Sequence, residues 1–166
     1  MLREYEINKP ANLRGYPLHR MVAELTNNEP SLFSDEGGTL LVRTAANIDA
    51  EPKALKELDV GEITAFELRA CVSKKRKGKH IYLPSDDWRA RHAWLKNKSA
   101  DNGFEILTLH SSSTMFRIQD QNRSFKIDQT DFTGILKVAD KNLFTTALAK
   151  GIGSTAKTFG YGMLVI

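Results

Sequence analysis

Apolar and polar residues alternate along short stretches of the first half of the chain, and this period of two predicts strands with one buried face. The predicted strands cover residues 1–7, 39–45 and 63–72. Between the first two, apolar residues recur at helical spacing: Leu18, Met21, Val22 and Leu25. Pro17 suits the first position of this helix, because its missing N–H would be unpaired there.

The second half of the chain repeats the alternation of strands and helices. Alternating or short apolar stretches predict strands at 81–83, 104–110, 114–120, 123–127 and 132–139. Two helices are expected. Ser85 caps the first, with Asp86 and Asp87 in its first turn, and Asp140 caps the second, which Gly151 ends. The apolar residues 163–166 predict a final strand that is buried on both faces.

Each long helix therefore has strands before and after it, and this order predicts an α+β fold of two modules. Each module is expected to be an antiparallel sheet with its helices on one face. The basic run SKKRKGKH interrupts the pattern at 73–80. Residues 74–79 are therefore the predicted junction between a first module at 1–73 and a second at 80–166.

Composition narrows the class of protein without fixing it. The 166 residues carry a formal charge of +4 and a sequence pI near 9.2, which permits an anionic partner. The lone Cys71 excludes a disulfide framework, and the four histidines show no metal-binding spacing, so neither a metal nor a cofactor is predicted. The sequence offers no bilayer-spanning run and no signal segment, so we expect a cytoplasmic protein without a membrane partner.

Four glycines lie close together in GIGSTAKTFGYG, at 151–162. This stretch nearly matches the dinucleotide-binding and P-loop fingerprints. Both fingerprints need a strand before the loop and a helix after it, whereas here a helix precedes the glycines and a strand follows. A tight connection between helix and strand would use one or two glycines, so the excess favours close approach of the backbone to a ligand.

The same region, ALAKGIGSTAKTFGYGMLVI, resembles the C-terminal glycine-rich signature of the RAMP superfamily of CRISPR proteins. Other stretches are similar, in the same order, to the CasE family, the CRISPR repeat-processing endoribonucleases of type I-E systems. These stretches are YPLHRMVAEL, AFELRACVSKKRKGKHIYLP, HAWLKNKSADNGFEIL and FTGILKVAD. The resemblance spans nearly the whole chain.

This resemblance implies a fold of two ferredoxin-like (RRM-like) modules in tandem. It also implies a protein that binds the hairpin of a CRISPR repeat transcript and cuts once at the 3′ base of the stem. In the family the ribose 2′-OH attacks the adjacent phosphate without a metal, leaving a 2′,3′-cyclic phosphate and a 5′-OH. The enzyme typically stays on its product and becomes a subunit of a CRISPR effector complex.

Such a reaction needs a group that accepts the 2′-proton, a group that protonates the leaving 5′-oxygen, and cations around the phosphorane. His19 is the candidate, because it borders the apolar stripe near a helix N-terminus, which attracts phosphate and keeps the imidazole neutral. The family match of Tyr16-Pro17-Leu18-His19 favours catalysis over a histidine without function. Tyr16 either orients the 2′-OH or the phosphate, or packs beside the helix start.

Basic residues supply the expected contacts with RNA. Arg20 contacts phosphate or faces solvent, and the basic run is either a solvated loop or a surface for the RNA backbone. The full set of predicted RNA-binding residues is Arg20, Lys74, Lys75, Arg76, Lys77, Lys79, Arg123, Lys126, Gly153 and Lys157. Among the other histidines, His80 is a reserve candidate for acid or base, and His92 is expected to pack in the structure.

A second function remains open from the sequence. The same modules suit a non-cleaving RAMP subunit that holds a guide RNA in an effector complex. The pair of His19 and Tyr16 favours the nuclease. A general RRM finds no support, since no predicted strand carries the aromatic RRM pattern.

Overall fold

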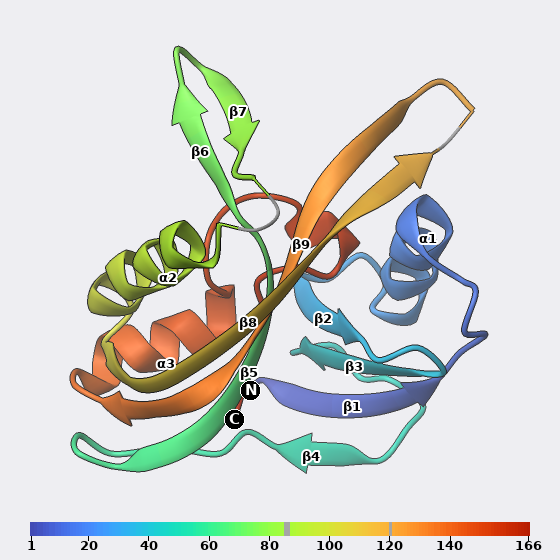
Figure 1. Cartoon of the computed structure of the whole chain (residues 1–166). Coiled ribbons are helices and arrows are strands. Elements are labelled where there is room, and N and C mark those ends of the chain that lie inside the picture. The colour runs from blue at the N-terminus through green and yellow to red at the C-terminus, as the bar shows by residue number, and fades with distance from the viewer. Residues whose placement is uncertain (85–86, 120) are drawn as a thin grey trace.

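The computed structural model describes residues 1–84, 87–119 and 121–166, and within these ranges the description does not extend to the side chains of Lys74, Lys75, His80 and Tyr82. The chain forms two four-stranded antiparallel sheets, and the strands β6 and β7 form a separate hairpin (Figure 1). The strand orders are β2-β3-β1-β4 and β10-β5-β9-β8.

The first sheet consists of β1 (Arg3–Asn8), β2 (Ser31–Asp35), β3 (Thr39–Thr44) and β4 (Pro52–Ala54). α1 (Gly15–Leu25) connects β1 to β2 and packs Leu18 and Val22 against the sheet. The strand order is that of a ferredoxin-like unit. Residues 45–51 connect β3 to β4 without a helix, so this module has one helix where a complete unit has two.

The second sheet consists of β5 (Ile63–Cys71), β8 (Phe104–Gln119), β9 (Ser124–Val138) and β10 (Leu164–Val165). α2 (Trp88–Asp101) and α3 (Lys141–Lys150) pack Leu95 and Phe144 into one core with its strands. This module follows the complete β-α-β-β-α-β order, with the hairpin β6 (Ser73–Arg76) to β7 (Lys79–Tyr82) inserted after β5. The predicted α+β fold of two ferredoxin-like modules is confirmed.

β5 is hydrogen-bonded into the second sheet, although the sequence placed it in the first module. It pairs with β9 from Ile63, opposite Lys137, to Cys71, opposite Gln129, and it also pairs with β10. The change of sheet therefore comes at residues 55–62, and the predicted junction forms the projecting β6–β7 hairpin. The limits 1–73 and 80–166 as separate units stay a prediction.

The helix starts differ in detail from the prediction. α1 begins at Gly15, so Pro17 is its third residue, still in the first turn where a backbone N–H has no helical partner. Asp87 is the N-cap of α2, with its side chain accepting a hydrogen bond from the Ala90 N–H at 3.0 Å. The predicted cap Ser85, like Asp86, lies outside the described residues.

The strands are longer and more numerous than the alternating pattern predicted. The runs 104–110 and 114–120 join into β8, and the runs 123–127 and 132–139 join into β9. The two strands continue far beyond the sheet as a projecting arm (Figure 1). β2 and β4 were not predicted.

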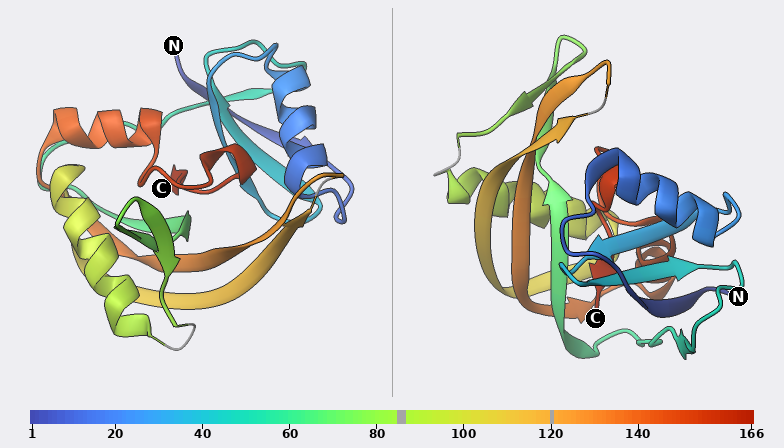
Figure 2. Two further views of the ribbon diagram at one scale, coloured as in Figure 1. Left: turned by 90° about the horizontal axis from the view of Figure 1, so that it is seen from above. Right: turned by 90° about the vertical axis from the view of Figure 1, so that its right-hand side faces the viewer.

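The two modules lie side by side, with the glycine-rich segment between them (Figure 2). Arg43 of β3 is 1% exposed and ties the modules together. Its guanidinium donates to the carbonyl oxygens of Leu148 in α3, at 2.7 Å, and Leu164 in β10, at 2.9 Å. It also pairs with Glu4 of β1. The interface between the modules therefore contains a buried, fully paired charge.

Candidate functional site

Three predicted site residues lie along one side of α1. At about 100° per residue, Tyr16 lies between the other two, about 60° from His19 and about 40° from Arg20. The buried Leu18 and Val22 point to the other side of the helix, toward the first sheet. His19 is partly exposed and Arg20 is exposed. The core contacts of α1 thus leave these three side chains outside the core of the first module.

His19 lines a cleft of about 500 Å³ between α1, the start of β2 and the glycine-rich segment. We call this space the His19 cleft. Lys150, the last residue of α3, and Lys157, the first residue of the short helix η1 (Lys157–Phe159), line its other side. Glu29 is also part of the lining. The structure therefore brings His19 of the first module and Lys157 of the second to one cleft.

Lys157 is held in place by the end of α3. Its ammonium group donates to the carbonyl oxygen of Lys150 at 2.6 Å, where the helix dipole favours a cation. Burial lowers the pKa of Lys157, and the charge of Lys150 lowers this pKa further. A bound phosphate would relieve the repulsion between the two ammonium groups, so the cleft suits an anion.

Contacts within the protein explain three of the four glycines of the loop. A Cβ at Gly160 would lie 2.6 Å from the ring of Phe33, and one at Gly151 would lie 2.8 Å from the carbonyl oxygen of Gly162. At Gly162 a Cβ would lie 2.7 Å from the carbonyl oxygen of Ile152. The excess of glycine thus reflects how the segment packs on itself and on β2, and it is no sign of a ligand.

Gly153 has a different environment. It has a φ of +77°, and a Cβ there would approach the ring of Trp94 in α2 to 3.3 Å. The neighbouring Thr155 shares a hydrogen bond with Ser73, at 3.3 Å between their oxygens. Gly153 therefore lies against α2, and it is not among the residues that line the His19 cleft. Its predicted contact with RNA stays a prediction.

Tyr16 connects α1 to η1 and faces a second space. Its ring packs edge-on against Phe159, with 5.0 Å between the centroids. Beside it lies a hollow of about 440 Å³, lined by Tyr16, Pro17, Arg20, Gln119, Gln121 and Asn122. We call this space the tip hollow, because its last three residues lie at the tip of the β8–β9 arm. Tyr16 and Arg20 thus line the space beside the arm, while His19 lines the cleft that it shares with the two lysines.

The remaining predicted basic residues lie on the two projecting hairpins. Arg76, Lys77 and Lys79 are exposed around the turn of β6–β7, and Arg123 and Lys126 are exposed on the β8–β9 arm. Both hairpins project from the same end of the molecule (Figure 1). None of these five lines the His19 cleft. The side chains of Lys74 and Lys75 lie outside the described part.

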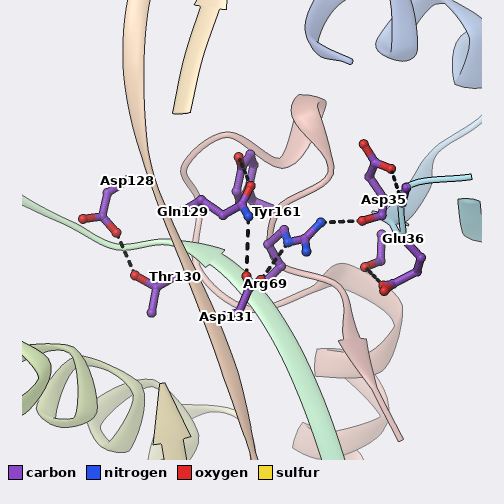
Figure 3. A network of polar contacts seen from close by, with 10 residues as sticks. Asp35, Glu36, Arg69, Asp128, Gln129, Thr130, Asp131 and Tyr161 are labelled. Atoms are coloured by element: carbon purple, nitrogen blue, oxygen red, sulfur yellow. Dashed lines mark hydrogen bonds and ion pairs between the residues drawn. The ribbon is translucent and has the colours of Figure 1, made fainter. Parts of the chain in front are cut away.

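A polar network at the centre of the molecule was missed from the sequence (Figure 3). The Nε of Arg69 donates to Asp131 at 2.7 Å, and its guanidinium also donates to the carbonyl oxygen of Asp35 in β2. The hydroxyl of Tyr161 donates to Gln129 at 3.0 Å, and burial raises the pKa of this phenol strongly. In β5, Leu68 and Ala70 are buried on either side of Arg69, so Arg69 lies opposite the core face, and its partners come from distant segments.

The other histidines have separate environments. The Nε2 of His92 lies 2.9 Å from the hydroxyl oxygen of Ser111, which joins α2 to β8. Burial lowers the pKa of His92, and Lys96 and His110 lower it further. His110 is exposed on β8, and the side chain of His80 lies outside the described part. Within the described residues, no three His, Cys, Asp or Glu side chains gather as metal ligands, and no helix is long and apolar enough to cross a membrane.

Solved structures share this architecture over the whole chain. A structure of Thermus thermophilus Cse3 bound to an RNA representing a pre-cleavage complex matches with a TM-score of 0.84 at 21% identity, covering 99% of this chain and 98% of that one. Cas6e from Escherichia coli K-12 matches with a TM-score of 0.77 at 25% identity and the same coverage. A chain of the E. coli Cascade structure bound to a PAM-containing dsDNA target matches at 0.63 and 23% identity, covering 99% of this chain and 96% of that one. A search of curated protein sequences finds no match.

The fold and the site thus describe a protein of two ferredoxin-like modules, with a histidine of one module and lysines of the other lining a single cleft. A family model described as CRISPR associated protein matches residues 12–166. The chain belongs to this family of CRISPR associated proteins. The resemblance to the CasE family is confirmed by this match together with the structures of Cse3 and Cas6e.

Proposed function

We propose that this protein is an endoribonuclease that cuts the hairpin of CRISPR repeat RNA into mature guide RNA. The observation that carries the proposal is the His19 cleft, which a partly exposed histidine and two lysines line together. Relatives of the same fold support it, since one is named a CRISPR endoribonuclease bound to a 19 nt RNA and another is bound to an RNA that represents a pre-cleavage complex.

The proposed reaction is a metal-independent transesterification. The ribose 2′-oxygen attacks the adjacent phosphorus and loses its proton, the bond from phosphorus to the 5′-oxygen breaks, and that oxygen gains a proton. The products are a 2′,3′-cyclic phosphate and a 5′-OH. His19 takes part in the proton transfer, a role that suits an imidazole near neutral pH.

The neighbours of His19 have supporting roles in this proposal. Lys157 and Lys150 stabilise the charge that develops on the phosphorane, because both line the cleft and the ammonium group of Lys157 is already held there by a hydrogen bond before the RNA arrives. Tyr16 orients the 2′-OH or the phosphate, and its contact with Phe159 limits its movement. Arg20 contacts a phosphate next to the cut.

We propose that the two basic hairpins, β6–β7 and the β8–β9 arm, bind the stem of the RNA hairpin. An A-form stem is recognised mainly by its shape and backbone, because side chains cannot read its deep and narrow major groove. Projecting hairpins with exposed lysines and arginines fit such contacts. The contacts would supply affinity that falls steeply with salt, and little base specificity.

After cutting, the protein is proposed to stay with its product as a subunit of an effector complex. The similar chain in a Cascade structure supports this partner. The same similarity also fits the second candidate function, a subunit that holds guide RNA without cutting it.

A cleavage assay in EDTA on a labelled repeat hairpin tests the proposal, with analysis of the product ends. Wild type is compared with His19→Ala, and with His110→Ala as the matched control, since His110 is exposed on β8 and lies outside the cleft. We expect metal-free cutting to a cyclic phosphate and a loss of about 10²- to 10⁴-fold in rate for His19→Ala alone. RNA affinity should be unchanged in both variants.

Two outcomes would contradict the proposal. Tight binding without cutting by wild type would favour the guide-holding subunit. A His19→Ala protein that cuts at the rate of wild type would remove His19 from the reaction.

A further inference from the structure

We propose that one flank of α2 is a further RNA-binding surface, on which an unpaired nucleotide of the repeat transcript stacks. The surface consists of Trp88, Arg89, His92 and Lys96, and we call these four residues the α2 stripe. The inference rests on the proposed function, because it takes repeat RNA as the ligand. It adds a contact with a base to a protein whose other predicted contacts are with the RNA backbone.

The geometry of α2 brings the four side chains together. At about 100° per residue, they occupy an arc of about 100° on the circumference of the helix. Trp88 begins the helix and is 50% exposed. Arg89 and Lys96 are exposed, and His92 is partly exposed. The α2 stripe therefore presents one aromatic ring and two cations to solvent.

The indole of Trp88 is held by its neighbours. The ring of His92 meets it edge-on, with 5.2 Å between the centroids, and the Nε2 of His92 lies 2.9 Å from the hydroxyl oxygen of Ser111 in β8. The guanidinium of Arg89 lies 4.5 Å from the centroid of the indole. A ring that is already held loses little conformational entropy when a base stacks on it. The indole and the guanidinium are both flat, so together they form a platform for a base.

This combination of groups favours unpaired RNA as the ligand. Proteins bind single strands with cations, which contact the phosphates, and with aromatic rings, on which the bases stack. A paired stem is bound through its shape and backbone, because its bases are already stacked on one another. Since every base has a π face, we expect the α2 stripe to accept any of the four bases.

The α2 stripe also lies in the direction in which a bound hairpin extends. Trp88 comes six residues after the end of β7. α1 and α2 lie on opposite sides of the molecule, below the β8–β9 arm and below the β6–β7 hairpin respectively (Figures 1 and 2). A stem that is cut at His19 and bound by both hairpins therefore extends from α1 toward α2. Its terminal loop and its flanks supply the unpaired nucleotides.

The test measures the Kd of a repeat hairpin that carries a 2′-deoxyribose at the cut, so that it is not cleaved. The full RNA is compared with one whose loop is replaced by a polyethylene glycol linker and with one that lacks the flanks. The proteins are wild type, Trp88→Leu, which keeps an apolar side chain, and Trp88→Phe, which keeps a ring. Leu143→Ala is the control, because Leu143 is an exposed apolar residue of α3. Thermal unfolding checks that all four are equally folded.

We expect Trp88→Leu to bind the full RNA about tenfold more weakly than wild type, and Trp88→Phe and Leu143→Ala to bind it nearly as well. This difference should disappear with one of the two shortened RNAs, which identifies the loop or the flank as the source of the nucleotide. The full RNA should also quench the tryptophan fluorescence of wild type. The quenching should be lost in Trp88→Phe, which retains only Trp94.

The salt dependence of binding tests the two cations. One phosphate contact of a single strand contributes about 0.7 to the slope of log Kd against log salt concentration. Arg89→Ala and Lys96→Ala should each reduce the slope by about this amount. Lys137→Ala, at an exposed lysine of β9, is the matched control and should keep the slope of wild type. Unchanged slopes in both α2 variants would overturn the assignment of these cations to RNA.

Other outcomes would overturn the stacking contact. If Trp88→Leu bound all three RNAs as wild type does, the inference would be wrong and the nuclease would stand. An equal loss on all three RNAs would also contradict it, since the indole would then act through the stem or the fold. If the variant kept its RNA affinity but no longer entered the effector complex, the α2 stripe would be a contact with protein instead. A wild type that neither binds nor cuts repeat RNA would overturn the proposed function and this inference with it.

Discussion

The two modules share one topology but differ in how they are stabilised. The second has both helices, a core that runs through α2, α3 and four strands, and a buried ion pair between Arg91 and Asp128. The first has one helix and a smaller core around Leu18, Phe33 and Leu40.

This difference shows why the candidate site lies between the modules. The first module supplies the helix that carries His19. It also packs against the second module, through the hydrogen bonds of Arg43 and through contacts with the glycine-rich segment. The same segment carries Lys157 into the His19 cleft. The stability of the first module and the geometry of the site therefore depend on the same contacts. Substitutions can distinguish the stability of one module from that of the other.

The largest effect is expected within the second module, at Arg91. Arg91 and Asp128 are each 1% exposed, and the guanidinium also donates to Thr130 at 3.1 Å. Arg91→Leu leaves the Asp128 carboxylate buried without its partner, which costs about 3–5 kcal/mol of unfolding free energy. Urea unfolding followed by tryptophan fluorescence measures it, since Trp88 and Trp94 both lie on α2.

A double variant, Arg91→Leu with Asp128→Leu, is the control for this prediction. It removes both charges and should recover most of the loss, because apolar replacements of a buried pair are often neutral. Both variants lose the hydrogen bonds from Arg91 to the carbonyl oxygens of Leu83, Pro84 and Asp87. If the two were equally destabilised, the loss would come from these bonds or from packing, and not from the unpaired charge.

The next effect is expected between the modules, at Arg43→Met. This change leaves the carbonyl oxygens of Leu148 and Leu164 without their donor, and an unsatisfied buried polar group costs about 1–3 kcal/mol. We expect a loss of about 3 kcal/mol that falls mainly on the first module. Since both tryptophans lie in the second module, far-UV circular dichroism should detect unfolding at lower urea than fluorescence does. Coincident transitions would show that the modules unfold together.

A smaller effect is expected where the glycine-rich segment meets β2. Gly160→Ala at a φ of +90° places a methyl group 2.6 Å from the ring of Phe33, so strain and overpacking add to about 2 kcal/mol. Gly37→Ala is the matched control, because it has a φ of +87° and nothing within 4 Å of its Cβ. The difference between the two losses in urea unfolding measures the contact. Equal losses would mean that the segment can move away from β2.

The sequence predicted the parts of the fold that depend on local pattern. Alternation found β5 and the two ends of both β8 and β9, and Asp140 was identified as the cap of α3, with its side chain accepting from the Leu143 N–H at 2.9 Å. The sheet to which β5 belongs was not predicted, because its pairing partners in β9 lie 58 to 74 residues further along the chain and alternation does not specify them.

The candidate site was predictable only in part, for a similar reason. His19, Tyr16 and Arg20 are close in sequence, so helical spacing alone places them on one side of α1. Their relation to Lys157 needed the fold, because the glycine-rich segment reaches α1 through tertiary contacts such as Tyr16 with Phe159. The network around Arg69 was missed for the same reason, as its partners come from β2 and β9.

The smallest predicted effect is a pH dependence that comes from His92 in α2. The pKa of His92 is lowered by burial, by Lys96 and by His110, so the unfolded chain binds its proton more readily than the folded one. Stability contributed by His92 is therefore lost as the pH falls through the ordinary value of 6.5 toward the folded pKa. Because the ring is partly exposed, the loss is below about 1 kcal/mol.

His92→Gln, which can keep the hydrogen bond to Ser111, tests this pH dependence. The difference in unfolding free energy between pH 7.5 and pH 5.5, measured by urea unfolding, should be smaller in this variant than in wild type. An unchanged slope in the variant would assign the pH dependence to groups outside α2.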